Sequence, residues 1–140
     1  MTEIRINDGL QTFSLNGKCE ITYNPTDVFF LERIYNAIDE LDAKQENLSK
    51  MRDDLKTPKE IFAFARKQDE QMRDIVNGLF GVDVCYALFG TTNIYAMDGE
   101  GLPLWSGLLL SIFDTMDDAT KSEEKKTNPR IDKYTKKYHR

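Results

Sequence analysis

Apolar and polar residues alternate over three short stretches at the start of the chain. The alternating apolar positions are Ile4 and Ile6, then Phe13 and Leu15, then Cys19, Ile21 and Tyr23. A period of two is typical of strands that bury one face. Asn7-Asp8-Gly9 and Asn16-Gly17 separate the stretches, and these residue types tolerate the positive φ of tight turns. The pattern predicts a three-stranded antiparallel meander within about residues 3–23.

From residue 24 the apolar spacing changes to three and four, which is typical of helices. Asn24-Pro25-Thr26-Asp27 supplies a cap, a proline at the first helical position and an acid in the first turn, so we expect a helix from residue 25 to about Leu55. Its apolar stripe is Leu31, Ile34, Ile38, Leu41, Gln45 and Leu48. A stripe of this length needs a matching partner, either the second half of an antiparallel hairpin or another copy of itself.

A second start signal, Thr57-Pro58-Lys59-Glu60, places Thr57 as the cap and Glu60 where it can bond back to that cap. Gly81 is expected to end this helix in the left-handed conformation. Its stripe is Ile61, Ala65, Met72, Ile75, Val76 and Leu79. Because only a short turn near Lys56 separates the two helices, they are expected to pack as an antiparallel pair.

The remaining apolar pattern predicts a short helix over residues 82–89, an irregular loop over 91–101 anchored by Ile94 and Tyr95, and one more core helix. That helix opens at Leu102-Pro103, and its pattern ends after Asp118. Its apolar face is Trp105, Leu108, Leu109, Ile112, Phe113 and Met116. The predicted fold is therefore α+β and mainly α, with the meander packed against a long helical hairpin and one further core helix.

Charge divides the chain into two parts. Residues 1–120 hold 11 Lys/Arg against 21 Asp/Glu, whereas residues 121–140 hold 8 against 3. We expect a single domain over residues 1–120 and a basic tail over 121–140, which has too few aliphatic side chains to form core. Asn128-Pro129 could cap a short tail helix with Ile131, Tyr134 and Tyr138 on one side. The net charge of −5 argues against a body that binds nucleic acid or anionic membrane.

The expected compartment is the cytoplasm. The N-terminal MTEIRINDG lacks the basic-then-apolar pattern of a signal peptide, and the longest uncharged apolar-rich stretch, residues 101–113, is shorter than the ~20 residues that span a bilayer. Cys19 and Cys85 lie far apart without a C-x-x-C motif, which favours reduced thiols.

No catalytic, cofactor or metal site is predicted. His139 is the single histidine and lies next to the last residue, so it cannot complete a hydrolase triad or a histidine metal site in a fixed pocket. Adjacent acidic pairs on helices point in different directions, and Asp98-Gly99-Glu100-Gly101 lacks the spacing of a calcium loop and predicts a turn. Phosphate-binding glycine motifs are absent from the sequence. We expect a protein that is not an enzyme and uses no cofactor.

Two groups of residues are candidates for partner binding. Aromatic side chains often form core, but those around two short segments are more numerous than one helix face can bury: Phe29, Phe30, Phe62 and Phe64. The tail group is Lys133, Tyr134, Lys136, Lys137 and Tyr138. The tail could stack on single-stranded nucleic acid, dock on an acidic partner or simply keep the chain soluble.

Four segments carry a resemblance to a known family: NPTDVFFLERIYNAIDELD, KEIFAFARKQDEQMRDIVNGLFG, VDVCYALFG and the closing NPRIDKYTKKYHR. Together they resemble small proteins encoded in siphophages and prophages of Gram-positive bacteria, over most of residues 20–140. Members are generally regarded as tail proteins, often labelled tail assembly chaperones, that act next to the tape-measure protein. The resemblance implies a non-enzymatic chaperone-like role, tape-measure or other tail proteins as partners, and self-association as a homo-oligomer.

Other functions remain open from the sequence. The protein could be a structural tail or connector subunit that stays in the phage particle. It could also be a nucleic-acid-binding regulator that acts through residues 121–140, although the charge balance makes this reading weaker. A small-molecule enzyme ranks below these because the chain offers no nucleophile, base and orienting group together.

Overall fold

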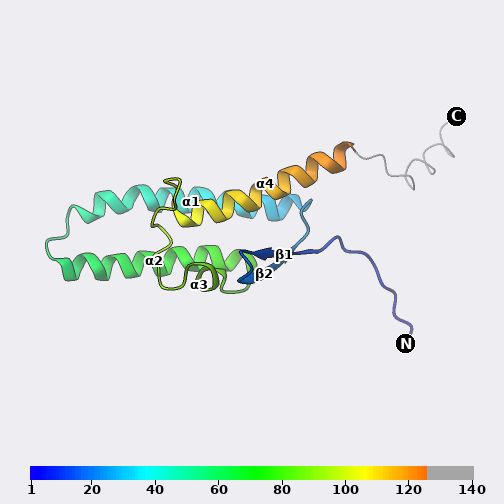
Figure 1. Cartoon of the computed structure of the whole chain (residues 1–140), viewed down its shortest axis with the longest axis horizontal. Helices are drawn as coiled ribbons and strands as arrows, with labels where there is room; N and C mark the ends of the chain where they lie inside the picture. The colour runs from blue at the N-terminus through cyan, green and yellow to red at the C-terminus, as the bar shows by residue number, and fades with distance from the viewer. Residues whose placement is uncertain (126–140) are drawn as a thin grey trace.

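The computed structural model describes residues 1–125, without the side chains at positions 49, 52 and 123–125. Within these residues two strands precede four helices: β1 (Gln11–Leu15), β2 (Cys19–Tyr23), α1 (Val28–Arg52), α2 (Pro58–Phe80), α3 (Val84–Phe89) and α4 (Leu104–Lys125). Figure 1 shows α1 and α2 as a long antiparallel hairpin, with α4 lying along one half of α1. The α+β, mainly α fold class is confirmed.

The sheet is a two-stranded antiparallel hairpin in which Phe13 pairs with Ile21. Asn16 and Gly17 have φ of 54° and 66°, and the Lys18 N–H donates to the Leu15 carbonyl at 2.9 Å, so the predicted turn is confirmed. The predicted first strand is wrong. Residues 1–10 form no strand, and Figure 1 shows this segment leading away from the body.

Side chains at the predicted first turn explain why the predicted first strand does not pair with β1. In a two-residue hairpin loop the Leu10 N–H would donate to the carbonyl of residue 7, but here it donates to Asp8 Oδ1 at 3.0 Å. The Gly9 N–H likewise donates to Asn7 Oδ1 at 3.0 Å. These Asx turns take the donors that would close the hairpin. As a result Ile4 and Ile6 are each 82% exposed.

Local caps begin and end the helical hairpin. Asp27, rather than Asn24, caps α1 by accepting from the Phe29 N–H, so the predicted start at residue 25 is wrong, and Pro25 lies in the turn before the helix. The α1 helix ends at Arg52, before the predicted Leu55. In α2 the predicted cap Thr57 and the left-handed Gly81 are both confirmed. Glu60 accepts from the Lys56 N–H, one residue before the cap.

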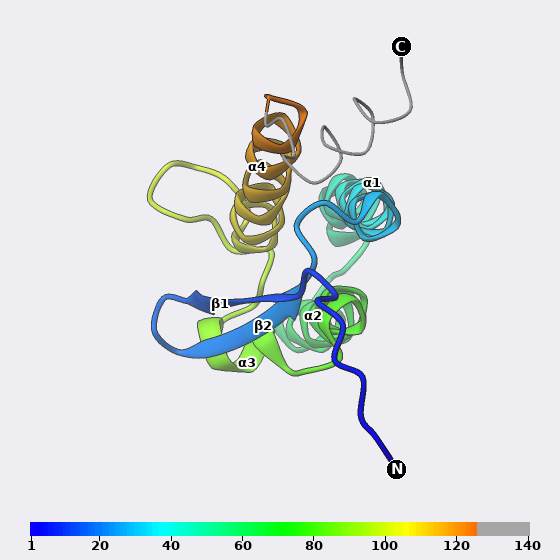
Figure 2. The same ribbon diagram turned by 90° about the vertical axis from the view of Figure 1, so that its right-hand side faces the viewer.

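One core joins the sheet to the helices. The predicted α1 stripe is confirmed at Ile34 and Leu41, which are fully buried. Met72 and Val76, from the predicted stripe of α2, are fully buried as well. The α4 helix closes the core with Trp105, Leu109, Ile112 and Met116. The end-on view in Figure 2 places the strands between α3 and α4, beside the α1–α2 hairpin.

An aromatic ladder ties the sheet to both helices of the hairpin at its open end. Phe13 stacks on Tyr23 with ring centroids 4.6 Å apart, and Tyr23 stacks on Phe30 at 5.0 Å. Phe30 then meets Phe80 at 6.1 Å in a tilted arrangement. Such pairs add about 0.5–1.5 kcal/mol each beyond the area that they bury. The small sheet is therefore held by side chains rather than by further strands.

The α4 helix continues to Lys125, past the predicted end of the pattern at Asp118 and across the boundary expected at residue 120. An ion pair between Lys121 Nζ and Asp117 Oδ2 at 3.0 Å spans one helical turn there. Apolar periodicity marks where a helix packs, whereas the helix itself can run on through good helix formers such as Ala, Lys and Glu. The predicted tail helix at Asn128-Pro129 lies outside the described residues.

Candidate functional site

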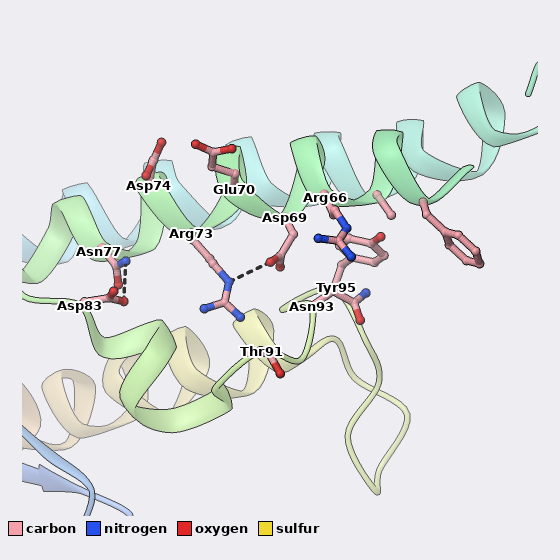
Figure 3. Close-up of a pocket in the computed structure, with 12 residues that line it drawn as sticks. Arg66, Asp69, Glu70, Arg73, Asp74, Asn77, Asp83, Thr91, Asn93 and Tyr95 are labelled. Atoms are coloured by element: carbon pink, nitrogen blue, oxygen red, sulfur yellow. Dashed lines mark hydrogen bonds and ion pairs between the residues drawn. The ribbon is translucent and has the colours of Figure 1, made fainter. Parts of the chain in front are cut away.

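A polar groove runs along α2, beside α3 and the loop that follows it (Figure 3). Its volume is about 820 Å³. The charged side chains that line it are two arginines and four acids: Arg66, Arg73, Asp69, Glu70, Asp74 and Asp83. Ligand-binding pockets are concave and contain a few polar groups that converge on the ligand, so the arrangement of these side chains decides what the groove can bind.

Asp69 and Arg73 use this groove to hold the loop onto α2. Arg73 Nε donates to Asp69 Oδ2 at 2.8 Å, and its Nη2 donates to the carbonyls of Gly90 and Thr92 at 2.8 and 2.7 Å. The other Asp69 oxygen accepts from the Ile94 N–H at 2.7 Å. The Asp69 and Arg73 side chains are 18% and 16% exposed. Charge-assisted hydrogen bonds to three backbone groups fix the loop in place.

One turn further along α2, Asn77 holds the start of α3. Its Nδ2 donates to Asp83 Oδ1 at 3.0 Å, and its Oδ1 accepts from the Cys85 N–H at 3.1 Å. Asp83 also caps α3 by accepting from the Tyr86 N–H. Asp69, Arg73 and Asn77 recur every four residues and so share one face of α2. This face, which the sequence reading missed, is a clamp for the α3 segment and the following loop.

The remaining acids of the groove do not converge on a common point. Glu70 and Asp74 are exposed and point away from the loop in Figure 3. The described residues contain no group of three His, Cys, Asp or Glu side chains placed to hold a metal ion. The polar groups of the groove that do converge are engaged by the backbone of the protein itself. The groove therefore explains how the loop is positioned and offers no arrangement of nucleophile, base and orienting group.

Cys85 is fully buried beside this clamp, and Cys19 is half-buried; both are free thiols, as expected. Burial raises the pKa of Cys85 to about 12, with a smaller opposing effect of Arg73. A thiol with such a pKa stays protonated near neutral pH and is a poor nucleophile.

The same pKa predicts a loss of stability at alkaline pH. Between pH 9 and 12 the unfolded thiol ionises while the folded thiol stays protonated, so the free energy of unfolding should fall by up to about 1.4 kcal/mol per pH unit. Below pH 9 both states are protonated and this contribution is constant. Cys85→Ala should flatten the slope and Cys19→Ala should keep it, as measured by urea unfolding across this pH range. Burial also raises the pKa of Tyr23, so some slope above pH 10 should remain in Cys85→Ala.

Asp98 organises the loop before α4. Its Oδ1 accepts from the N–H groups of Glu100 and Leu102 at 2.7 and 3.0 Å, and its own N–H donates to the Leu102 carbonyl at 2.7 Å. The prediction of a turn over Asp98-Gly99-Glu100-Gly101 is confirmed. Ile94 is fully buried and Tyr95 packs partly against the core, so the predicted anchors of this loop are confirmed as well.

The four predicted aromatic contacts lie in different environments. Phe29 is 72% exposed at the start of α1, whereas its neighbour Phe30 is 5% exposed and belongs to the aromatic ladder. Phe62 is 64% exposed and Phe64 is half-buried, both near the start of α2. Phe29 and Phe62 lie at opposite ends of the hairpin. Phe62 shares a groove with Leu48 of α1, and the helix rises about 28 Å from Phe29 to Leu48. The tail candidates, Lys133 to Tyr138, lie outside the described residues.

A second, more apolar groove lies where the hairpin extends beyond α4. We call it the tip groove; its volume is about 370 Å³, and it is lined by Gln45, Leu48, Ile61, Phe62, Phe64, Ala65, Tyr95 and Met97. Trp105, near the start of α4, donates from Nε1 to Gln45 Oε1 at 3.0 Å, which marks how far α4 reaches along α1. Beyond that point α4 does not cover the hairpin in Figure 1. Met97 and Met51 are 58% and 49% exposed there.

The sequence reading found Phe62 and Phe64 but missed Leu48, Tyr95 and Met97. Leu48 was assigned to the buried stripe and Tyr95 to a loop anchor, and both are also accessible from the tip groove. The signal that could have found the groove is length, because the predicted last helix is shorter than either arm of the hairpin. Some of the α1 stripe must then lack a covering helix.

Within residues 1–125 the helices are all too short or too polar to cross a lipid bilayer. Comparison of the chain with protein families, with curated proteins and with solved structures finds no match.

Proposed function

We propose that this protein is a non-enzymatic, chaperone-like assembly factor of a phage or prophage tail, which binds the tape-measure protein or another tail component in the bacterial cytoplasm. The observation that carries the proposal is the uncovered end of the hairpin, where Phe62, Met97 and Met51 are about half or more exposed. Exposed large apolar side chains that gather at one place are typical of protein interaction surfaces. The family resemblance supplies the identity of the partner.

The polar groove along α2 supports the same proposal. Its convergent groups, Asp69 and Arg73, are occupied by backbone atoms of the loop, so they serve the fold. A client-binding protein needs an apolar surface on a rigid, charged body and does not need an active site. Of the predicted aromatic contacts, Phe62 is the exposed one that lies at the uncovered end of the hairpin, so we expect the client to bind there and away from Phe29. We expect the tail residues 121–140 to modulate this binding.

Co-expression with the tape-measure protein encoded nearby tests the proposal. We expect a soluble complex of fixed stoichiometry that survives affinity capture and raises the soluble fraction of the tape measure. Light scattering of the complex with and without residues 121–140 measures the contribution of the basic tail. Lack of any complex, together with recovery of this protein in purified phage particles, would support a structural tail subunit instead.

A further inference from the structure

The basic residues of the body are concentrated at one end of the hairpin. Residues 44–67, which we call the hairpin tip, hold seven Lys/Arg and four Asp/Glu, a net charge of +3. The rest of residues 1–120 holds four Lys/Arg and 17 Asp/Glu, a net charge of −13. The tip is therefore a positive end on a strongly negative body.

The net charge along α1 and along α2 changes sign at the same level of the hairpin. In α1, residues 28–43 have a net charge of −3 and residues 44–52 of +2. In α2, residues 58–67 have a net charge of +2 and residues 68–80 of −2. Because the helices are antiparallel, the two positive segments lie together. In α1 the charge changes sign next to Gln45, which accepts a hydrogen bond from Trp105 near the start of α4. The part of the hairpin that α4 leaves uncovered is therefore the positive part.

Basic side chains flank the apolar lining of the tip groove. Lys59, Phe62 and Arg66 are spaced three and four apart, so they form one row along α2 with the exposed phenylalanine between two positive charges. Arg66 lines the neighbouring groove, which shares Phe62, Ala65 and Tyr95 with the tip groove. Among the side chains that the structure describes, neither Lys59 nor Arg66 forms an ion pair.

We propose that the tip groove binds an amphipathic helix whose polar face is acidic. The tip offers two helices and a loop with no open strand edge, so a helix is the element that can pack there. Its apolar side chains would enter between Leu48, Phe62 and Met97, and its carboxylates would meet Lys59 and Arg66. The incoming helix would cover the part of the hairpin that α4 leaves open. This inference rests on the proposed function and names the chemistry of the client.

The charge pattern selects this client over others. A basic helix would meet the positive rim, and like charges held close together oppose binding. A nucleic acid would meet the lysines but would also lie beside the acidic groove of Asp69, Glu70 and Asp74 and would leave the apolar lining exposed. Complementary charge also speeds encounter and fixes the orientation of a partner.

Two designed helical peptides of about 20 residues test the inference in the full-length protein. They share the same Leu positions, and one has Glu where the other has Lys on the polar face. We expect fluorescence polarisation to show at least about tenfold tighter binding of the Glu peptide. Phe62→Ser with Met97→Ser should weaken that binding about tenfold or more, and Lys59→Glu with Arg66→Glu should remove the preference for Glu over Lys. Phe29→Ser, at the far end of α1, is the matched control and should have no effect.

Equal affinity for both peptides, or an effect of Phe29→Ser equal to that of the tip variants, would overturn the inference. So would tighter binding of single-stranded DNA than of the Glu peptide, or self-association through the tip in sedimentation of the protein alone. Because the substituted side chains are exposed, circular dichroism should show unchanged folding in each variant. A tape-measure complex that forms but does not weaken in the tip variants would refute this inference and leave the proposed function intact. If the Glu peptide binds the tip but no complex with tail proteins forms, the inference about the tip groove would stand and the proposed function would be refuted.

Discussion

Leu109→Ala is expected to lower the free energy of unfolding by about 3 kcal/mol, within the 2–5 kcal/mol that buried leucines usually lose. Leu109 is fully buried and lies on the face of α4 that packs against α1. Truncation removes apolar contacts and leaves a cavity between two helices that cannot close freely. Urea unfolding followed by circular dichroism measures the change, provided that the denaturant slope is the same in both proteins.

The next residue provides the control for this prediction. Leu110 is 40% exposed on the same helix, so Leu110→Ala should cost less than about 1 kcal/mol. Both variants make the same chemical change and have the same effect on helix propensity. Equal losses in Leu109→Ala and Leu110→Ala would contradict the packing of α4 on the hairpin described above.

Arg73→Ala should also destabilise the protein, by about 3 kcal/mol. The substitution removes the partly buried ion pair with Asp69 and two donors to the carbonyls of Gly90 and Thr92. It also leaves the Asp69 carboxylate with less compensation for its burial. Hydrogen exchange should show faster exchange of the Ile94 N–H, which Asp69 holds, because the loop loses its attachment to α2.

Arg66→Ala is the matched control for the clamp. Arg66 lies two turns before Arg73 on the same groove but is exposed, so its removal should change stability by less than about 0.5 kcal/mol. Urea unfolding of both variants gives the comparison. An Arg73→Ala protein as stable as Arg66→Ala would show that the loop is held by its buried Ile94 and does not need the clamp.

The helical hairpin could be predicted because its local and tertiary signals agree. Thr57 and Gly81 cap α2 as the sequence indicates, and the stripes that include Leu41 and Met72 become the core. The three-stranded meander failed where two local signals compete. Alternation at Ile4 and Ile6 favours a strand, but Asn7 and Asp8 bond the backbone donors that a hairpin needs.

The candidate surface could be predicted only in part. The aromatic excess pointed to the right segments, yet Phe30 is buried because Tyr23, from the distant β2 strand, stacks on it. Phe62 and Phe64 differ in exposure because two residues of helix place their side chains on different faces. The point on α1 at which α4 stops covering the hairpin, Gln45, depends on tertiary packing, and the residues around it do not indicate it.

Charge shows the same limit of sequence reading. Summed along the chain, residues 1–120 are an acidic body, and the first division of charge falls at the tail. Folding brings the end of α1 next to the start of α2, so two modestly basic segments become one positive surface. Because residues 44–67 are consecutive in the chain, summing charge over a shorter stretch would have revealed the positive segment, but the sequence does not show that α4 leaves this segment uncovered.

The most direct test of the account is an NMR titration of the isotopically labelled full-length protein with the Glu peptide. We expect shifts of the side-chain signals of Leu48, Phe62 and Met97, with those of Phe29 unchanged. Such a result would place the client on the uncovered, positive end of the hairpin. Shifts centred on the groove of Asp69 and Asp83, or no shifts when the peptide is in excess, would contradict the account.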